Sequence, residues 1–118
     1  MLASERLLQS QERMGERVER IVPAELDGES LRLILYLLDG TNVRVTEAWR
    51  GEQLVRVSYY WLTADNQLKI GWDNAPHHDH LDTFPHHKHV RHQRDLRPSD
   101  ATRLEEVLRE ILSVHEEE

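Results

Sequence analysis

Residues 30–73 read SLRLILYLLDGTNVRVTEAWRGEQLVRVSYYWLTADNQLKIGWD, and this stretch decides the fold. It contains four segments in which apolar, β-branched and aromatic residues dominate or alternate with polar ones, a pattern typical of β-strands. These segments are residues 30–38, 43–49, 53–63 and 68–72. Short segments containing Asp, Asn or Gly separate them, and these residue types favour tight turns. Four strands joined by short turns predict an antiparallel β-meander.

The second and third of these strands are expected to be polar on one side, because side chains alternate between the two faces of a strand. The two polar sides carry, in chain order, Arg44, Thr46, Arg56, Ser58 and Tyr60. Tyr59 and Trp61 fall together with valines on the apolar side. We therefore expect Tyr59 and Trp61 in the core rather than on a surface that stacks bases.

Helices are predicted on both sides of this stretch. Apolar residues in the N-terminal segment recur at coiled-coil-like spacing, so we expect a helix over residues 1–22. Its apolar stripe is narrow, and packing against the sheet and a homodimer seam both remain open. A wider stripe predicts a C-terminal helix over residues 99–115, with Ser99 or Asp100 as its N-cap.

The predicted fold class is α+β, with a four-stranded antiparallel β-meander over residues 30–73 flanked by the two helices. The 118 residues suffice for a single domain with one modest core. Residues 74–98 lie between the fourth strand and the last helix and contain Pro76 and Pro85, which disfavour a continuous helix. We expect this segment to be an ordered, histidine-rich loop.

The composition excludes several classes of protein. There is no Cys, so disulfides and thiolate metal sites are ruled out. No run approaches the ~20 apolar residues of a membrane span. The first residues lack the basic region and apolar core of a signal peptide. We therefore expect a cytoplasmic protein that has no contact with a membrane.

The net charge of −7 is unevenly distributed. Residues 1–30 carry four Arg and seven acidic residues, and residues 99–118 carry two Arg and seven acidic residues. Residues 31–98 carry nine Lys or Arg and eight acidic residues. The acidic ends argue against a broad surface for duplex DNA, whereas the near-neutral middle is compatible with a phosphate ligand.

The middle of the chain contains a repeated histidine motif. Residues 72–92, WDNAPHHDHLDTFPHHKHVRH, hold seven of the eight histidines. PHHDH begins at Pro76 and PHHKH begins at Pro85. Imidazole is the side chain whose ordinary pKa, ~6.5, lies closest to physiological pH, so such a run suits proton transfer, metal binding or phosphate recognition.

The strands, the two histidine motifs and the final helix, from about residue 30 to residue 112, together resemble the TumE-type toxins of prokaryotic toxin–antitoxin pairs. The residues that carry the resemblance are Asp73, Asn74, Pro76, His77, His78, Phe84, Pro85, His86, His87, Lys88 and His89. The resemblance implies a small toxin of a type II system, neutralised by a cognate helix-turn-helix antitoxin.

We first consider a metal-independent endoribonuclease without a cofactor. Cleavage of RNA through the 2′-hydroxyl needs a base, an acid and cations near the phosphate. In an extended chain, residues i and i+2 point the same way, so His78 with His80 and His87 with His89 form one-sided pairs. The candidate catalytic residues are His77, His78, His86, His87 and His89, and the candidate RNA-binding residues are Asp73, Asn74, Lys88, Arg91 and Arg94.

Two other functions remain open. A divalent site for zinc, nickel or manganese would combine histidines with Asp73, Asp79 or Asp82, although no HExxH spacing is present. A binding module would recognise phosphate groups or the antitoxin without chemistry. Most of the histidines are expected to be structural, and Asp73 and Asn74 are more often loop braces than reactive groups.

Overall fold

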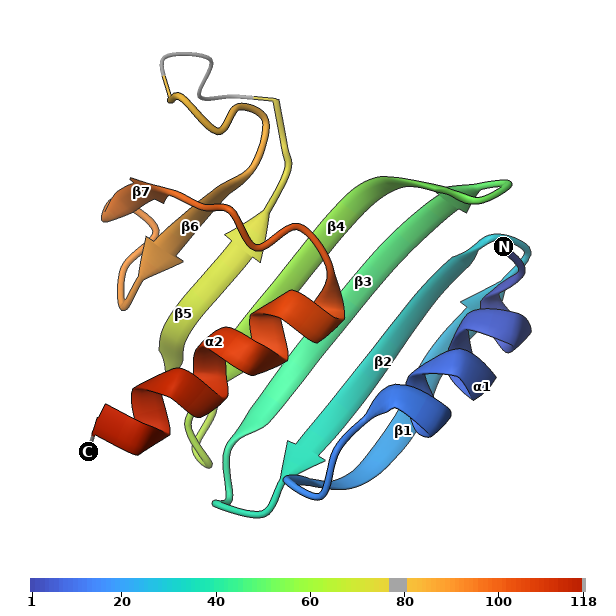
Figure 1. Ribbon diagram of the computed structural model, residues 1–118, viewed down its shortest axis with the longest axis horizontal. Coiled ribbons are helices and arrows are strands. Elements are labelled where there is room, and N and C mark those ends of the chain that lie inside the picture. Colours follow the sequence, from blue (N-terminus) through green and yellow to red (C-terminus); the bar gives the residue numbers. More distant parts are fainter. Residues whose placement is uncertain (77–80, 118) are drawn as a thin grey trace.

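The strands predicted between residues 30 and 73 are confirmed as consecutive, antiparallel neighbours in a larger sheet. In the computed structural model, which describes residues 1–76 and 81–117, the sheet has seven strands rather than four (Figure 1). The strands are β1 (Val18–Asp27), β2 (Ser30–Leu37), β3 (Asn42–Arg50), β4 (Gln53–Leu62), β5 (Leu68–Asp73), β6 (His87–Val90) and β7 (Leu96–Pro98). Their order in the sheet follows the chain, so the fold is a meander.

The predicted N-terminal helix is correct in its first half only. Helix α1 (Ala3–Arg13) ends well before residue 22, and the second half forms β1. Gly15 weakens a helix by about 1 kcal/mol relative to Ala, and the β-branched residues that follow it favour a strand. Pro23 lies within β1, where an edge strand tolerates a missing N–H donor.

The prediction of a loop over residues 74–98 is wrong in its second half. Residues 87–90 form β6, which pairs with β5, and residues 96–98 form β7 at the sheet edge. Nearby prolines made both strands hard to predict from the sequence. Pro85 lies two residues before β6, and Pro98 is the last residue of the edge strand β7. Both are positions where a strand accepts proline.

The C-terminal helix starts later than predicted. Helix α2 (Leu104–Glu117) begins after residue 103, so neither Ser99 nor Asp100 is its cap. The Ser99 hydroxyl instead accepts a hydrogen bond from the Ala101 backbone N–H, at 3.2 Å. Just before the start of the helix, the Thr102 hydroxyl donates a hydrogen bond to the Glu106 carboxylate at 3.0 Å.

Both helices cover the same face of the sheet, and the core lies between them and the strands (Figure 1). As expected, Tyr59 and Trp61 belong to this core. The buried apolar residues of the described chain are Ala3, Leu31, Leu33, Leu35, Leu37, Val43, Val45, Trp49, Val57, Tyr59, Trp61, Trp72, Leu104, Val107 and Ile111. From α1, Ala3 belongs to this core and Leu7 packs against it. Neither described helix is long and apolar enough to cross a membrane.

Candidate functional site

The face of the sheet turned away from the helices, here called the open face, carries two rows of directly paired residues. The first row runs across five strands as Arg32, Thr46, Ser58, Asp73 and His87. The second row runs as Ile34, Arg44, Tyr60, Gly71 and His89. Each row includes a histidine of β6, so the strand register brings polar side chains from distant parts of the sequence to one place.

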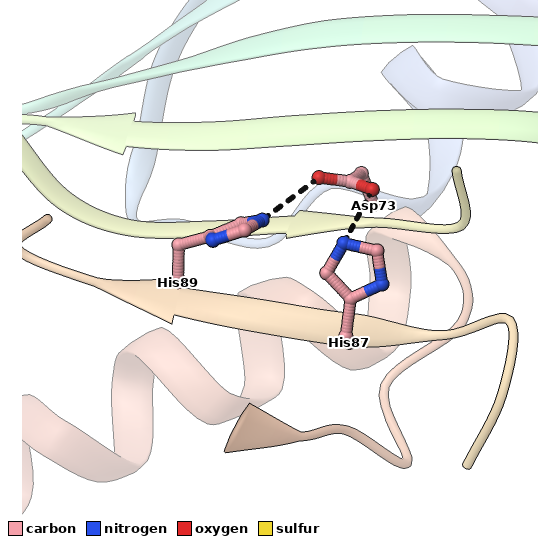
Figure 2. A group of neighbouring side chains, drawn as sticks. All are labelled: Asp73, His87 and His89. Carbon is pink, nitrogen blue, oxygen red and sulfur yellow. Dashed lines mark ion pairs between the residues drawn. The ribbon is translucent and has the colours of Figure 1, made fainter. Parts of the chain in front are cut away.

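Three side chains meet at the end of these rows and form what we call the Asp73 cluster. His87 Nε2 lies 2.7 Å from Asp73 Oδ1, and His89 Nε2 lies 3.3 Å from Asp73 Oδ2. Figure 2 shows both imidazole rings of β6 turned toward the carboxylate on the neighbouring β5. The cluster is largely buried: His87 is 2% exposed, His89 6%, and the Asp73 side chain 12%. The i, i+2 spacing within β6 places both rings on the same side.

Backbone carbonyls fix the orientation of both rings. His87 Nδ1 lies 3.0 Å from the Pro85 carbonyl oxygen, and His89 Nδ1 lies 2.8 Å from that of Gln93. A carbonyl oxygen only accepts hydrogen bonds, so each Nδ1 carries the hydrogen and each Nε2 faces the Asp73 carboxylate. The Ala75 N–H donates to Asp73 Oδ1 at 3.0 Å and holds the carboxylate in place. The cluster is therefore oriented from outside by the main chain.

The composition of the Asp73 cluster suits a metal ion as well as proton transfer. One ligand atom from each of Asp73, His87 and His89 can be chosen so that all three lie within 4.8 Å of one another. Two imidazole nitrogens and one carboxylate oxygen are a donor set found in zinc and non-haem iron enzymes.

A hollow of about 220 Å³ lies on the open face next to the cluster. Its lining includes Thr46, Ala48, Arg56, Ser58, Tyr60 and Asp73. The Tyr60 ring lies over Gly71, where any Cβ atom would overlap it. Because Gly71 has no side chain, the Tyr60 ring can lie over it. Gly71 pairs with Tyr60 on one side and with His89 on the other. The hollow therefore borders Asp73.

The open face is basic although the whole chain is acidic. Arg20, Arg32, Arg44 and Arg56 are exposed on its strands. Arg20 lies over the Tyr36 ring at 4.3 Å, and Arg32 pairs weakly with Glu25 at 3.7 Å. A surface that combines exposed Arg with tyrosine rings is suited to the phosphates and bases of a single strand.

Of the predicted catalytic histidines, the structure brings two, His87 and His89, to the cluster. His86 lies on the helix side of the sheet, beside the start of α2. Burial lowers the pKa of His86, the charge of His87 acts in the same direction, and Glu106 opposes them. His77 and His78, together with the predicted partner His80, lie outside the described residues.

The predicted RNA-binding residues do not lie together in the structure either. Asp73 belongs to the cluster, whereas Asn74 is a brace, accepting from the Val57 N–H at 2.9 Å and donating to the Val55 carbonyl. Lys88 points to the helix side, where its ammonium donates to Glu110 at 3.2 Å. The two remaining residues, Arg91 and Arg94, are exposed in the turn between β6 and β7.

Sequence reasoning missed the basic residues that share the open face with the cluster. Arg44 and Arg56 come from β3 and β4, far from the histidine motifs in the sequence. The signal for them was the alternation of polar and apolar residues in these strands. It places them on a polar side, but it does not show that β6 continues the same sheet.

A second charged cluster lies on the helix-covered face, between α1 and the sheet. Arg6 of α1 makes two hydrogen bonds to the Glu47 carboxylate, at 2.8 and 3.1 Å, and a third to Glu105 at 2.8 Å. Trp49 and Tyr59 also donate to Glu47, at 3.0 and 2.6 Å. Burial acts to lower the pKa of Arg6, but the two carboxylates more than offset it and the pKa is raised.

Comparison with known proteins adds one finding. The family model described as Toxin TumE matches residues 4–118, essentially the whole chain. No curated protein and no solved structure matches the sequence.

Proposed function

The chain belongs to the TumE toxin family, and from this premise we propose that it acts on RNA as an endoribonuclease whose reaction centre is the Asp73 cluster. The observation that carries the proposal is the continuity of three features on one face. Exposed arginines and a tyrosine ring lead across the sheet to the hollow, and the hollow ends at a carboxylate held between two imidazoles.

The chemistry that this arrangement supports is cleavage through the 2′-hydroxyl. The 2′-oxygen forms a bond to phosphorus as its proton is removed, and the bond from phosphorus to the 5′-oxygen breaks as that oxygen takes up a proton. The products are a 2′,3′-cyclic phosphate and a 5′-hydroxyl. The Asp73 cluster offers proton-accepting and proton-donating groups within hydrogen-bonding distance of one another, and general acid–base catalysis typically contributes 10²–10⁴-fold.

The open face supports binding of single-stranded rather than duplex RNA. Its arginines are spread over four strands, and Tyr60 presents a ring at the edge of the hollow. Aromatic rings stack on unpaired bases regardless of sequence, and Arg contacts the phosphates. We propose that a single strand crosses the rows with a phosphate above Asp73, where Arg56 offsets its charge.

The proposed protein partner is a cognate antitoxin of the helix-turn-helix type. Helix-turn-helix proteins that bind DNA carry basic surfaces, and both ends of this chain are acidic. Charge complementarity of this kind favours fast and selective association. In this proposal the antitoxin contacts α2, whose residues include five Glu and one Arg.

Digestion of a defined single-stranded RNA tests the proposal. Asp73→Asn and His87→Gln are expected to lower the cleavage rate by about 10²–10⁴-fold, because each removes a group of the cluster. His92→Gln is the matched control, since it removes an exposed histidine from the turn after β6 and is expected to keep full activity. Circular dichroism establishes that each variant is folded. Full activity in a folded Asp73→Asn protein would refute the proposal.

A further inference from the structure

We propose that the Asp73 cluster binds one divalent transition-metal ion of the zinc class, through Asp73, His87 Nε2 and His89 Nε2, with its remaining coordination positions turned toward the hollow. The inference concerns binding and does not depend on RNA cleavage. It departs from the metal-independent mechanism predicted from the sequence, and with the ion bound these three groups would be ligands in place of the proton donors and acceptors proposed above. Its basis is the geometry of the three side chains.

The spacing of the donor atoms fits an ion of this class. Ligands about 2.1 Å from a tetrahedral zinc ion stand about 3.4 Å apart. In the cluster, the two nitrogen–oxygen pairs are 2.7 and 3.3 Å apart, and one atom from each of the three residues lies within 4.8 Å of the others. Small side-chain rotations therefore suffice to receive the ion.

The charge arrangement also calls for a cation among these atoms. Both Nδ1 atoms donate to carbonyl oxygens, so a neutral imidazole at either position directs the Nε2 lone pair at the Asp73 carboxylate. Lone pairs and a carboxylate that face one another in a buried place repel, unless protons or a metal ion lie between them. A divalent ion bound by all three groups satisfies them together.

The surroundings are those of a metal site. Histidines that bind metals nearly always donate their other N–H to a carbonyl or a carboxylate, which fixes the ring and makes it a better ligand. His87 and His89 both do so, and the Ala75 N–H orients Asp73. The ligands come from two directly paired strands, β5 and β6, which hold them more rigidly than a loop would.

The donor set selects the class of ion. Magnesium and calcium prefer oxygen ligands throughout, whereas two imidazoles and one carboxylate suit zinc, iron, nickel or manganese. Three protein ligands leave coordination positions open, as in catalytic zinc sites. Asp73 lines the hollow together with Ser58 and Tyr60, so a water molecule or a phosphate oxygen would reach a bound ion from this side.

Titration of the full-length protein with zinc chloride, followed by calorimetry, tests the inference. The wild type is expected to bind one ion per chain at this site. Asp73→Asn and His89→Gln are each expected to weaken binding by more than about 100-fold, because loss of an outer-shell partner alone typically costs 10–100-fold. The His92→Gln control is expected to bind as the wild type does.

The histidine-rich sequence makes a second control necessary. A variant with His77, His78 and His80 all replaced by Gln separates the cluster from adventitious binding by residues 77–80, and it is expected to keep the ion. Loss of the ion in this variant, with retention in Asp73→Asn, would overturn the inference. So would a wild type whose affinity is no higher than that of the Asp73→Asn/His87→Gln/His89→Gln triple variant.

Thermal unfolding provides a readout that depends neither on RNA nor on calorimetric heats. At a hundredfold excess over the Kd, zinc is expected to raise the Tm of the wild type by on the order of 10 °C. It is expected to leave the Tm of Asp73→Asn unchanged, and magnesium is expected to shift neither. A protein that binds zinc in these assays but leaves RNA intact would support the metal site and refute the nuclease. An equal zinc shift in wild type and a folded Asp73→Asn protein would overturn the metal site.

Discussion

The two faces of the sheet each hold a charged cluster, and the two clusters differ in what surrounds them. On the helix-covered face, Arg6 and Glu47 are 1% exposed and their described hydrogen bonds are made with core or helix residues. On the open face, the Asp73 cluster is nearly as buried, but it opens onto a hollow lined by polar side chains. The Arg6–Glu47 pair is closed off from solvent, whereas Asp73 borders a hollow on the surface.

This difference is the basis for assigning a structural role to the first cluster and for proposing a functional role for the second. Arg6 carries a positive charge that the carboxylates of Glu47 and Glu105 balance, so the cluster ties α1 and α2 to the sheet. The Asp73 cluster brings together two imidazoles and a carboxylate on strands that already pair through their main chains. Its side chains are therefore less needed for the fold and are available for chemistry.

The largest expected effect on stability comes from the closed cluster. Glu47→Gln leaves the Arg6 guanidinium buried with only one carboxylate, and breaking a buried pair typically costs about 3–5 kcal/mol. Urea unfolding measures the loss. Glu25→Gln is the control, because Glu25 and Arg32 are 57% and 66% exposed and such pairs contribute about 0–1 kcal/mol. Asp73→Asn is expected to cost only about 1 kcal/mol. A larger loss in Asp73→Asn than in Glu47→Gln would reverse the comparison.

Gly71→Ala probes the packing that shapes the open face. Its new methyl group would overlap the Tyr60 ring, so the ring must move, and such overpacking costs about 1–3 kcal/mol. Gly15→Ala is the matched control: its Cβ meets nothing within 4 Å, and its stability should stay the same or rise slightly. Urea unfolding measures both variants, together with the affinity for single-stranded RNA. Unchanged stability and affinity in Gly71→Ala would show that Tyr60 does not shape the hollow.

Replacing two arginines tests whether the open face is the RNA-binding side. The Arg44→Gln/Arg56→Gln variant is expected to bind single-stranded RNA about tenfold more weakly. Its slope of log affinity against log salt should fall by about 1.4, which is about 0.7 for each phosphate that an arginine no longer neutralises. The control is Arg13→Gln/Arg109→Gln, which removes the same charge from exposed positions on the two helices. An equal drop in affinity in both variants would mean that only net charge matters.

The smallest effect is the pH dependence of the closed cluster. Burial acts to raise the pKa of Glu105, but hydrogen bonding and the charge of Arg6 outweigh it and lower the pKa below the usual 4.5. The stability that Glu105 contributes is therefore fully present above about pH 4.5, and it is lost as the pH falls through the lowered pKa. The difference in unfolding free energy between wild type and Glu105→Gln, about 1 kcal/mol at pH 6, should shrink toward pH 3. A constant difference across this range would contradict the assignment.

The sequence predicted the fold best where alternation was strong. Strands β2 to β5 follow from their apolar residues and short turns, because one face of each must reach the core. Strand β1 was missed because its apolar residues also fit a helical spacing, and edge pairing with β2 decided between the two. Strand β6 was missed because it reads HKHV, which offers only one apolar residue to a pattern search.

The site was also predictable in part, because side chains alternate between the two faces of a strand. The i, i+2 spacing of His87 and His89 placed both rings on one side without any knowledge of the fold. Their meeting with Asp73 depends on the register in which Asp73 faces His87, and this pairing spans 14 residues. The same alternation places Lys88 on the helix side, because a residue between two rings on the open face must point to the other face. Its predicted contact with RNA stays a prediction.

The most direct test of a toxic activity centred on the open face is the growth of bacterial cells after induction of the protein without its antitoxin. Wild type and Asp73→Asn are compared at equal amounts of folded protein, with His92→Gln as the control. We expect wild type and His92→Gln to arrest growth, whereas cells making Asp73→Asn continue to grow. Growth arrest by Asp73→Asn equal to that of the wild type would contradict the assignment of function to the open face.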